Sequence, residues 1–122
     1  MVNWVSKAIT TTGSSGSATG SGTISIQGGG ILHTIYIDYH SMHVNTDVTI
    51  TETISGGDTR TLLTVSNNNT SNSYTPMKQA VDSSGAAIAN VYQLYTIGGQ
   101  LNISVAQGNE GDPGVTVSVL VV

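Results

Sequence analysis

The sequence predicts an all-β protein: an antiparallel β-sandwich of about eight strands, jelly-roll-like, with an extended N-terminal arm. Two observations support this prediction. Thr, Ser, Gly, Val and Ile dominate the 122 residues, only 8% of which are charged. Apolar and hydroxyl residues also alternate, as in residues 49–51 and 116–119. This period of two places one set of side chains in a core and the other on a wet face.

Residues 1–22 are expected to form an N-terminal arm and a Gly/Ser/Thr-rich linker, and residues 23–122 the β-sandwich domain. A leading apolar cluster of this kind often adds a strand to another sheet. Its members are therefore candidate contacts to a partner or a neighbouring subunit: Val2, Trp4, Val5 and Ile9. Deleting residues 1–12 should then weaken attachment to the partner while leaving the sandwich folded. The alternative is a first strand followed by a loose loop.

The strands of the first half follow from alternation and turn residues. Residues 23–26 form a short strand that ends at three glycines, and residues 31–40 alternate in a longer one. Residues 48–54 and 61–66 flank a Gly-Gly-Asp turn, which predicts a hairpin.

The second half begins with an Asn-rich loop at residues 67–72. Residues 74–81 are a strand that Pro76 confines to an edge or a bulge, because proline has no amide donor. Residues 91–97 and 100–107 around Gly98-Gly99 predict the clearest hairpin. A loop at residues 108–114 precedes the last strand, residues 115–122. The order of the strands in the sheets is left open.

Charge and composition argue against several classes of function. The formal net charge is −4 and the cations are Lys7, Arg60 and Lys78, too few and too scattered to bind nucleic acid. No apolar run approaches the roughly 20 residues of a membrane helix. Residues 1–12 contain no apolar segment of the kind that a secretory signal needs. We therefore expect neither nucleic acid nor membrane among the partners.

No catalytic, cofactor-binding or metal site is predicted. Asp38, His40 and His43 are the only compact cluster of metal-ligand types, and zinc usually needs three or four ligands held by further contacts. Histidines satisfied at a strand end are the preferred interpretation. Residues 109–112 lack the spaced carboxylates of a calcium loop. The nucleophile motif G-x-S-x-G is missing as well. We expect a non-enzymatic protein without cofactors.

Two polar loops are candidate contact surfaces. They would form the binding surface if the protein were a carbohydrate- or receptor-binding module of a phage tail, a fibre or a surface adhesin, with host glycans as partners. Their candidate residues are Asn67, Asn68, Asn69, Asn109 and Asp112.

Several segments together resemble a known family, the small head decoration (cement, or auxiliary capsid) proteins of tailed bacteriophages. The resemblance covers residues 23–122 and leaves out the arm. It rests on the order and character of the predicted strands and on short sequence segments. These segments are residues 31–40, 46–52, 62–66, 74–77, 81–88, 99–109 and 115–122.

The resemblance implies a structural virion protein on the outer surface of the capsid, made in the host cytoplasm. Such a protein bridges neighbouring major capsid proteins and stabilises the shell. The resemblance also implies self-association, with a homotrimer preferred and a dimer as the alternative.

Overall fold

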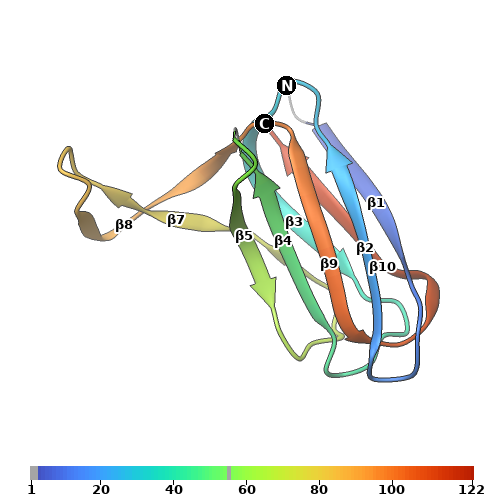
Figure 1. Cartoon of the computed structure of the whole chain (residues 1–122). Coiled ribbons are helices and arrows are strands. Elements are labelled where there is room, and N and C mark those ends of the chain that lie inside the picture. Colours follow the sequence, from blue (N-terminus) through green and yellow to red (C-terminus); the bar gives the residue numbers. More distant parts are fainter. Residues whose placement is uncertain (1–2, 55) are drawn as a thin grey trace.

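The computed structural model describes residues 3–54 and 56–122, which form strands and connecting loops and contain no helix (Figure 1). None of the described segments is therefore a helix that could cross a membrane. The strands are β1 (Asn3–Thr11), β2 (Ala18–Ser25), β3 (Gly30–Asp38), β4 (Asp47–Thr53), β5 (Thr59–Val65), β6 (Asn72–Tyr74), β7 (Met77–Val81), β8 (Ala87–Ile97), β9 (Gln100–Gly108) and β10 (Gly111–Val121).

The strands build two antiparallel sheets, so the predicted β-sandwich is confirmed. The first sheet has the order β1-β10-β3-β8-β7, with β6 paired to β3, and the second has the order β2-β9-β4-β5. Eight strands therefore pair in nested fashion: β1 with β10, β2 with β9, β3 with β8, and β4 with β5. This nesting is the topology of a jelly roll. Strands β6 and β7 are an insertion between its fifth and sixth strands.

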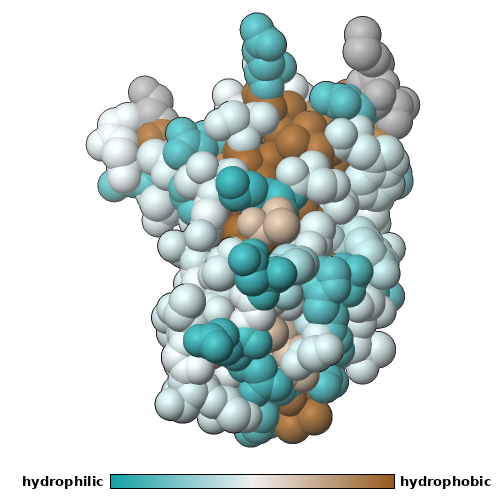
Figure 2. Space-filling model, turned by 90° about the vertical axis from the view of Figure 1, so that its right-hand side faces the viewer, coloured by the Kyte–Doolittle hydropathy of each residue, from teal (hydrophilic) through white to brown (hydrophobic). Residues whose placement is uncertain are grey.

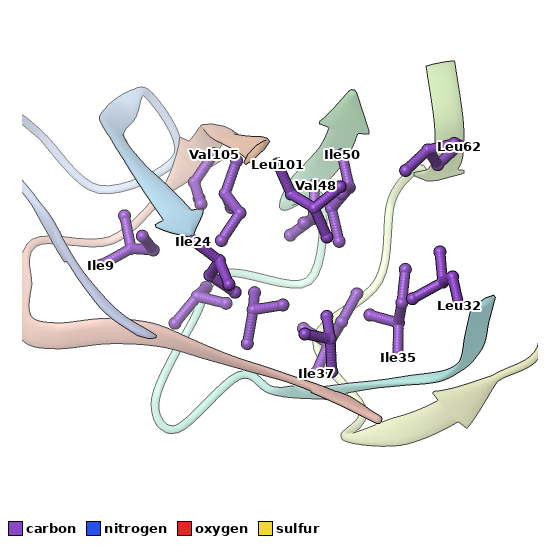
Figure 3. Packing of buried hydrophobic residues seen from close by; sticks show 14 of the residues in the cluster. Ile9, Ile24, Leu32, Ile35, Ile37, Val48, Ile50, Leu62, Leu101 and Val105 are labelled. Carbon is purple, nitrogen blue, oxygen red and sulfur yellow. The ribbon is translucent and has the colours of Figure 1, made fainter. Parts of the chain in front are cut away.

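The core lies between the sheets and consists of the inward members of the alternating pattern (Figure 3). The final strand is the clearest case, because Val115, Val117, Val119 and Val121 are all buried. Branched aliphatic side chains fill most of this space, and Tyr39 is the fully buried aromatic residue. Their burial removes apolar surface from water, and this hydrophobic effect is the main force that stabilises the fold.

The expected N-terminal arm and linker need correcting over residues 3–22. Strand β1 pairs with β10 from Asn3 to Thr11, and β2 pairs with β9, so the boundary expected at residue 22 falls inside a strand. Glycines 20 and 22 do not form a linker here; β1 packs closely against β2 at both. A Cβ at position 22 would lie 2.6 Å from Cδ1 of Ile9, and one at position 20 would collide with the carbonyl oxygen of Thr10.

Removing residues 1–12 should therefore unfold the sandwich instead of freeing it from an arm. The deletion takes away one of the two strands that pair with β10 and the buried side chain of Ile9. We expect a loss of more than about 4 kcal/mol in the free energy of unfolding, measured by circular dichroism in urea. Trp4→Ala is the control, because Trp4 is 53% exposed. A truncated chain with the unfolding midpoint of the full chain would contradict this expectation.

The hairpin predicted around Gly98-Gly99 is wrong. Strand β8 ends in the first sheet, where Ile97 pairs with Gly30, whereas β9 begins in the second sheet, where Gln100 pairs with Ser25. The two glycines form a corner at which the chain changes sheets, and the amide of Ile26 donates to the carbonyl of Gly99 at 2.5 Å. A corner and a hairpin turn need the same residue types, so local sequence does not distinguish them.

The other predicted hairpin, between β4 and β5, is confirmed. The segment predicted as one strand over residues 74–81 is divided by Thr75 and Pro76 into the end of β6 and the whole of β7. That division determines where the chain leaves the sandwich.

Candidate functional site

The two polar loops singled out in the sequence lie at the same end of the sandwich, on either side of the loop between β3 and β4. Nδ2 of Asn69 donates to the carbonyl oxygen of Met42 at 3.1 Å, and Nδ2 of Asn109 donates to that of Ser41 at 3.1 Å. Both amides therefore hold the same loop from opposite sides.

The remaining candidates of these loops also make contacts within the protein. Nδ2 of Asn68 donates to the hydroxyl of Tyr74 at 3.3 Å, and Asp112 accepts from the hydroxyl of Thr10 at 3.0 Å. The backbone amide of Asn67 donates to Asp47, while its side chain is exposed. Most of these polar groups fasten one loop to another, which leaves fewer of them for a ligand.

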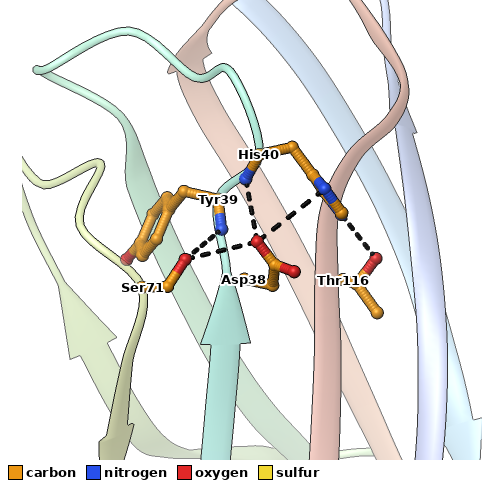
Figure 4. A network of polar contacts seen from close by, with 5 residues as sticks. All are labelled: Asp38, Tyr39, His40, Ser71 and Thr116. Carbon is orange, nitrogen blue, oxygen red and sulfur yellow. Dashed lines mark hydrogen bonds and ion pairs between the residues drawn. The ribbon is translucent and has the colours of Figure 1, made fainter.

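Asp38 and His40 form a polar network at the end of β3 (Figure 4). Oδ1 of Asp38 accepts from the backbone amide of His40 at 3.0 Å and from the hydroxyl of Ser71 at 3.2 Å. Nε2 of His40 lies 2.9 Å from Oγ1 of Thr116. His43 instead accepts from the amide of Asn45. Among the described residues no three metal-ligand side chains come together.

Tyr39 is buried beneath this end of the sandwich. Its ring belongs to the core, and its hydroxyl has no hydrogen-bond partner among the described residues. Burial, and to a lesser extent the neighbouring Tyr74, raises the pKa of the Tyr39 phenol to about 12. The buried site favours the neutral phenol over the phenolate.

Because of Tyr39, the stability of the fold should fall as the pH rises in the alkaline range. Its pKa is raised from 10.0 to about 12 on folding, so the stabilisation is complete below pH 10 and is lost as the pH rises through 12. We expect the wild type to lose about 2 kcal/mol more than Tyr39→Phe between these limits, measured by urea unfolding. Tyr36→Phe, at an exposed tyrosine, should behave as the wild type. Equal alkaline losses in all three proteins would rule the effect out.

The feature that stands out from the sandwich is a two-stranded ribbon, residues 77–94, made of β7, most of β8 and the turn between them. Figure 1 shows it extending sideways, away from both sheets. Strand β3 pairs with β8 only from Gly30 to Leu32, and further along the same edge it pairs with β6. The edge of β3 is thus already occupied by β6, and the chain turns outward after Pro76.

The ribbon exposes apolar side chains. Met77 pairs with Leu94 and Gln79 with Tyr92, so all four lie on one face of the ribbon. Met77 is 52% and Tyr92 57% exposed. Three further apolar side chains are exposed toward the tip: Val81, Ile88 and Val91. A projecting element of this kind, with an apolar surface, is typical of a site for another protein.

At the base of the ribbon lies an ion pair between a buried carboxylate and a partly exposed guanidinium. Glu52 on β4 is 2% exposed, and its Oε1 accepts from Nε of Arg60 at 2.8 Å and lies 2.7 Å from Nη2. Arg60 on β5 reaches across to the first sheet, where its guanidinium lies 5.1 Å from the centre of the Tyr95 ring. This ion pair was not among the sites predicted from the sequence. The available signal was a Glu in the inward register opposite an Arg on the paired strand.

The outer face of the second sheet carries a shallow groove of about 310 Å³, lined mainly by serine and threonine residues. Its side chains stand in rows across β2, β9 and β4: Ser21, Ser104 and Thr49 in one row and Thr23, Asn102 and Thr51 in the next. The described lining contains no aromatic ring. Figure 2 shows a different face, seen from the side of β1, β2 and β10; it is mostly pale, and apolar surface gathers near the end that carries the termini.

The four residues expected to contact a partner from the N-terminal arm are placed differently. Val2 lies outside the described residues. Ile9 is in the core, and Val5 packs against it. Trp4 remains on the surface, half exposed on the edge strand β1.

No family model matches the chain, and no curated protein matches it. Among solved structures, the mitogen derived from Yersinia pseudotuberculosis is 13% identical with a TM-score of 0.44, over 100% of this chain and 86% of that chain. TmCBM61, solved in complex with β-1,4-galactotriose, is 11% identical with a TM-score of 0.36, over 95% of this chain and 83% of that chain. At these values the likeness concerns the general β fold alone.

Proposed function

We propose that this protein is a non-enzymatic structural component of a bacteriophage virion that decorates the outer capsid surface and attaches through the ribbon. The observation that carries the proposal is the exposed apolar surface of residues 77–94, outside the sandwich. Its partner is the major capsid protein, and the attached form is a homotrimer.

An isolated two-stranded ribbon is at best marginally stable in water, because it has no hydrophobic face to bury. In β8, residues 87–93 are all exposed. Contact with a partner would bury Met77 and Tyr92 and give the ribbon the packing that the free protein does not supply. Large flexible and aromatic side chains are enriched in protein interfaces.

The class of partner is the one that the resemblance to decoration proteins implies. A protein that binds only the assembled shell shifts the equilibrium toward assembly, so modest contacts repeated over a symmetric lattice stabilise it. Residues 77–94 carry one Lys and one Asp, Lys78 and Asp82. This near-neutral surface can be buried without leaving an unpaired charge of one sign.

The test is co-sedimentation of the purified protein with mature capsids that lack it, with bound copies counted at saturation. The proposal expects a fixed ratio compatible with the symmetry of the shell and greater resistance of the decorated shells to heat. No binding at micromolar protein would refute it.

A second candidate function is carbohydrate binding, favoured by the groove on the second sheet with its serine, threonine and asparagine side chains. Its hydroxyls and the amide of Asn102 are the groups that hydrogen-bond sugars, and the groove volume is about 310 Å³. Against it stands the described lining, which has no ring for a sugar to stack on. Binding on a glycan array that Asn102→Ala abolishes would favour this candidate over capsid decoration.

A further inference from the structure

The ribbon is joined to the sandwich over a short junction. Only three residue pairs connect β8 to β3, ending at Leu32 with Tyr95. Beyond them β8 continues without a neighbour in the sheet other than β7. The direction in which the ribbon leaves the sandwich must therefore be set by contacts at this junction.

We propose that Glu52, Arg60 and Tyr95 act as a clamp that fixes the direction of the ribbon and so prepares it for binding. This inference rests on the proposed function in one respect, that the ribbon is the binding element. It assigns a positioning role to residues that need not touch the partner.

Arg60 supplies the connection between the two sheets. It belongs to β5, in the second sheet, yet its Nη2 donates to the backbone carbonyl of Thr96 on β8 at 2.5 Å. Its guanidinium also lies over the ring of Tyr95, one residue closer to the ribbon. The planar guanidinium makes both contacts at once, which a lysine ammonium does not reproduce.

Glu52 holds Arg60 in that position. One carboxylate oxygen accepts from Arg60, and the other accepts from the backbone amide of Gly98, at the corner where β8 ends. Both oxygens of this buried carboxylate are thus satisfied, the condition under which a buried ion pair is tolerated. One oxygen of the Glu52 carboxylate thus holds the end of β8 through Gly98. The other oxygen holds the guanidinium of Arg60, which lies over the ring of Tyr95.

A ribbon held in one direction loses less conformational freedom when it binds. Ordering of loops and side chains opposes association, and an element that is already ordered avoids much of that cost. If the clamp is broken, the ribbon should sample a wider range of directions while the sandwich stays intact, and attachment should weaken.

The experiment measures the ribbon in the free protein. Because the chain contains no cysteine, Ser83→Cys in the ribbon turn and Ser104→Cys on β9 introduce its only thiols, for a pair of spin labels. Pulsed electron paramagnetic resonance then gives the distance distribution. We expect Arg60→Met at least to double its width and Tyr95→Leu to widen it less. Lys78→Met, which removes a cation from the ribbon itself, should leave it unchanged.

Circular dichroism first establishes that each labelled variant is folded, and Tyr95→Leu serves as the test by itself if Arg60→Met is not. Unchanged widths in the folded variants would overturn the clamp, and so would equal broadening in Lys78→Met. Because no capsid is present, the clamp can hold even if capsid binding fails. Capsid binding can likewise hold with an unaltered distribution.

Discussion

Arg60→Met should lower the free energy of unfolding by about 3 kcal/mol, one of the largest effects expected from a single side chain in this protein. The substitution leaves the carboxylate of Glu52, which is 2% exposed, without its cation. It also removes the donor to Thr96. Urea unfolding at pH 7, followed by circular dichroism, measures the loss.

The double variant Glu52→Leu/Arg60→Met is the control for this prediction. It removes both charges together, so no carboxylate is left unpaired, and it should recover part of the stability. An unfolding midpoint for Arg60→Met equal to that of the wild type would contradict the importance of the pair.

Tyr92→Ala should lower the affinity for capsids by about 30-fold, equivalent to about 2 kcal/mol. Tyr92 lies on the same face of the ribbon as Met77 and is 57% exposed in the free protein. The substitution should therefore change the stability of the fold by less than about 0.5 kcal/mol. Quantitative co-sedimentation at several protein concentrations measures the affinity.

Tyr36→Ala is the matched control, because Tyr36 is another exposed tyrosine, on β3 in the first sheet. It should bind capsids as the wild type does. Equal weakening by both substitutions would mean that the ribbon has no special part in attachment, and no weakening by Tyr92→Ala would exclude this face of the ribbon.

Sequence patterning predicted the sandwich because its core strands alternate strictly. Val115, Val117, Val119 and Val121 are one face of β10, and that face is buried. The hairpin of β4 and β5 was predictable for the same reason, together with its Gly-Gly-Asp turn. These elements depend on local periodicity and local turn chemistry, both of which can be read from a single chain.

The N-terminal region was not predictable in this way. Its glycines have the composition of a flexible linker, but positions 20 and 22 require glycine because β1 crosses close to them. Composition does not distinguish a glycine that makes the backbone flexible from one that is needed because a neighbouring strand packs closely against it. The same limit applies to Gly98-Gly99, where the partner strands, far away in sequence, determine that the chain changes sheets.

The projection of the ribbon and the ion pair at its base could not be predicted from the sequence either. The sequence indicates strands near residues 74–81 and 91–97, but their departure from the sandwich depends on β6 occupying the edge of β3. Glu52 and Arg60 are eight positions apart and pair through the hairpin, whereas Tyr95 reaches them only through the packing of the two sheets. Asn69 and Asn109 were found by composition, but not their contacts with the intervening loop.

Photo-crosslinking from the ribbon to capsids tests directly whether the protein attaches through the ribbon. The chain has no cysteine, so Ala89→Cys places a thiol-linked photoprobe in the exposed part of β8 alone. Ser104→Cys carries the same probe on the outer face of the second sheet. We expect a crosslink to the major capsid protein from position 89 and none from position 104. A crosslink from position 104 alone, or none from either on capsids that bind the labelled proteins, would contradict it.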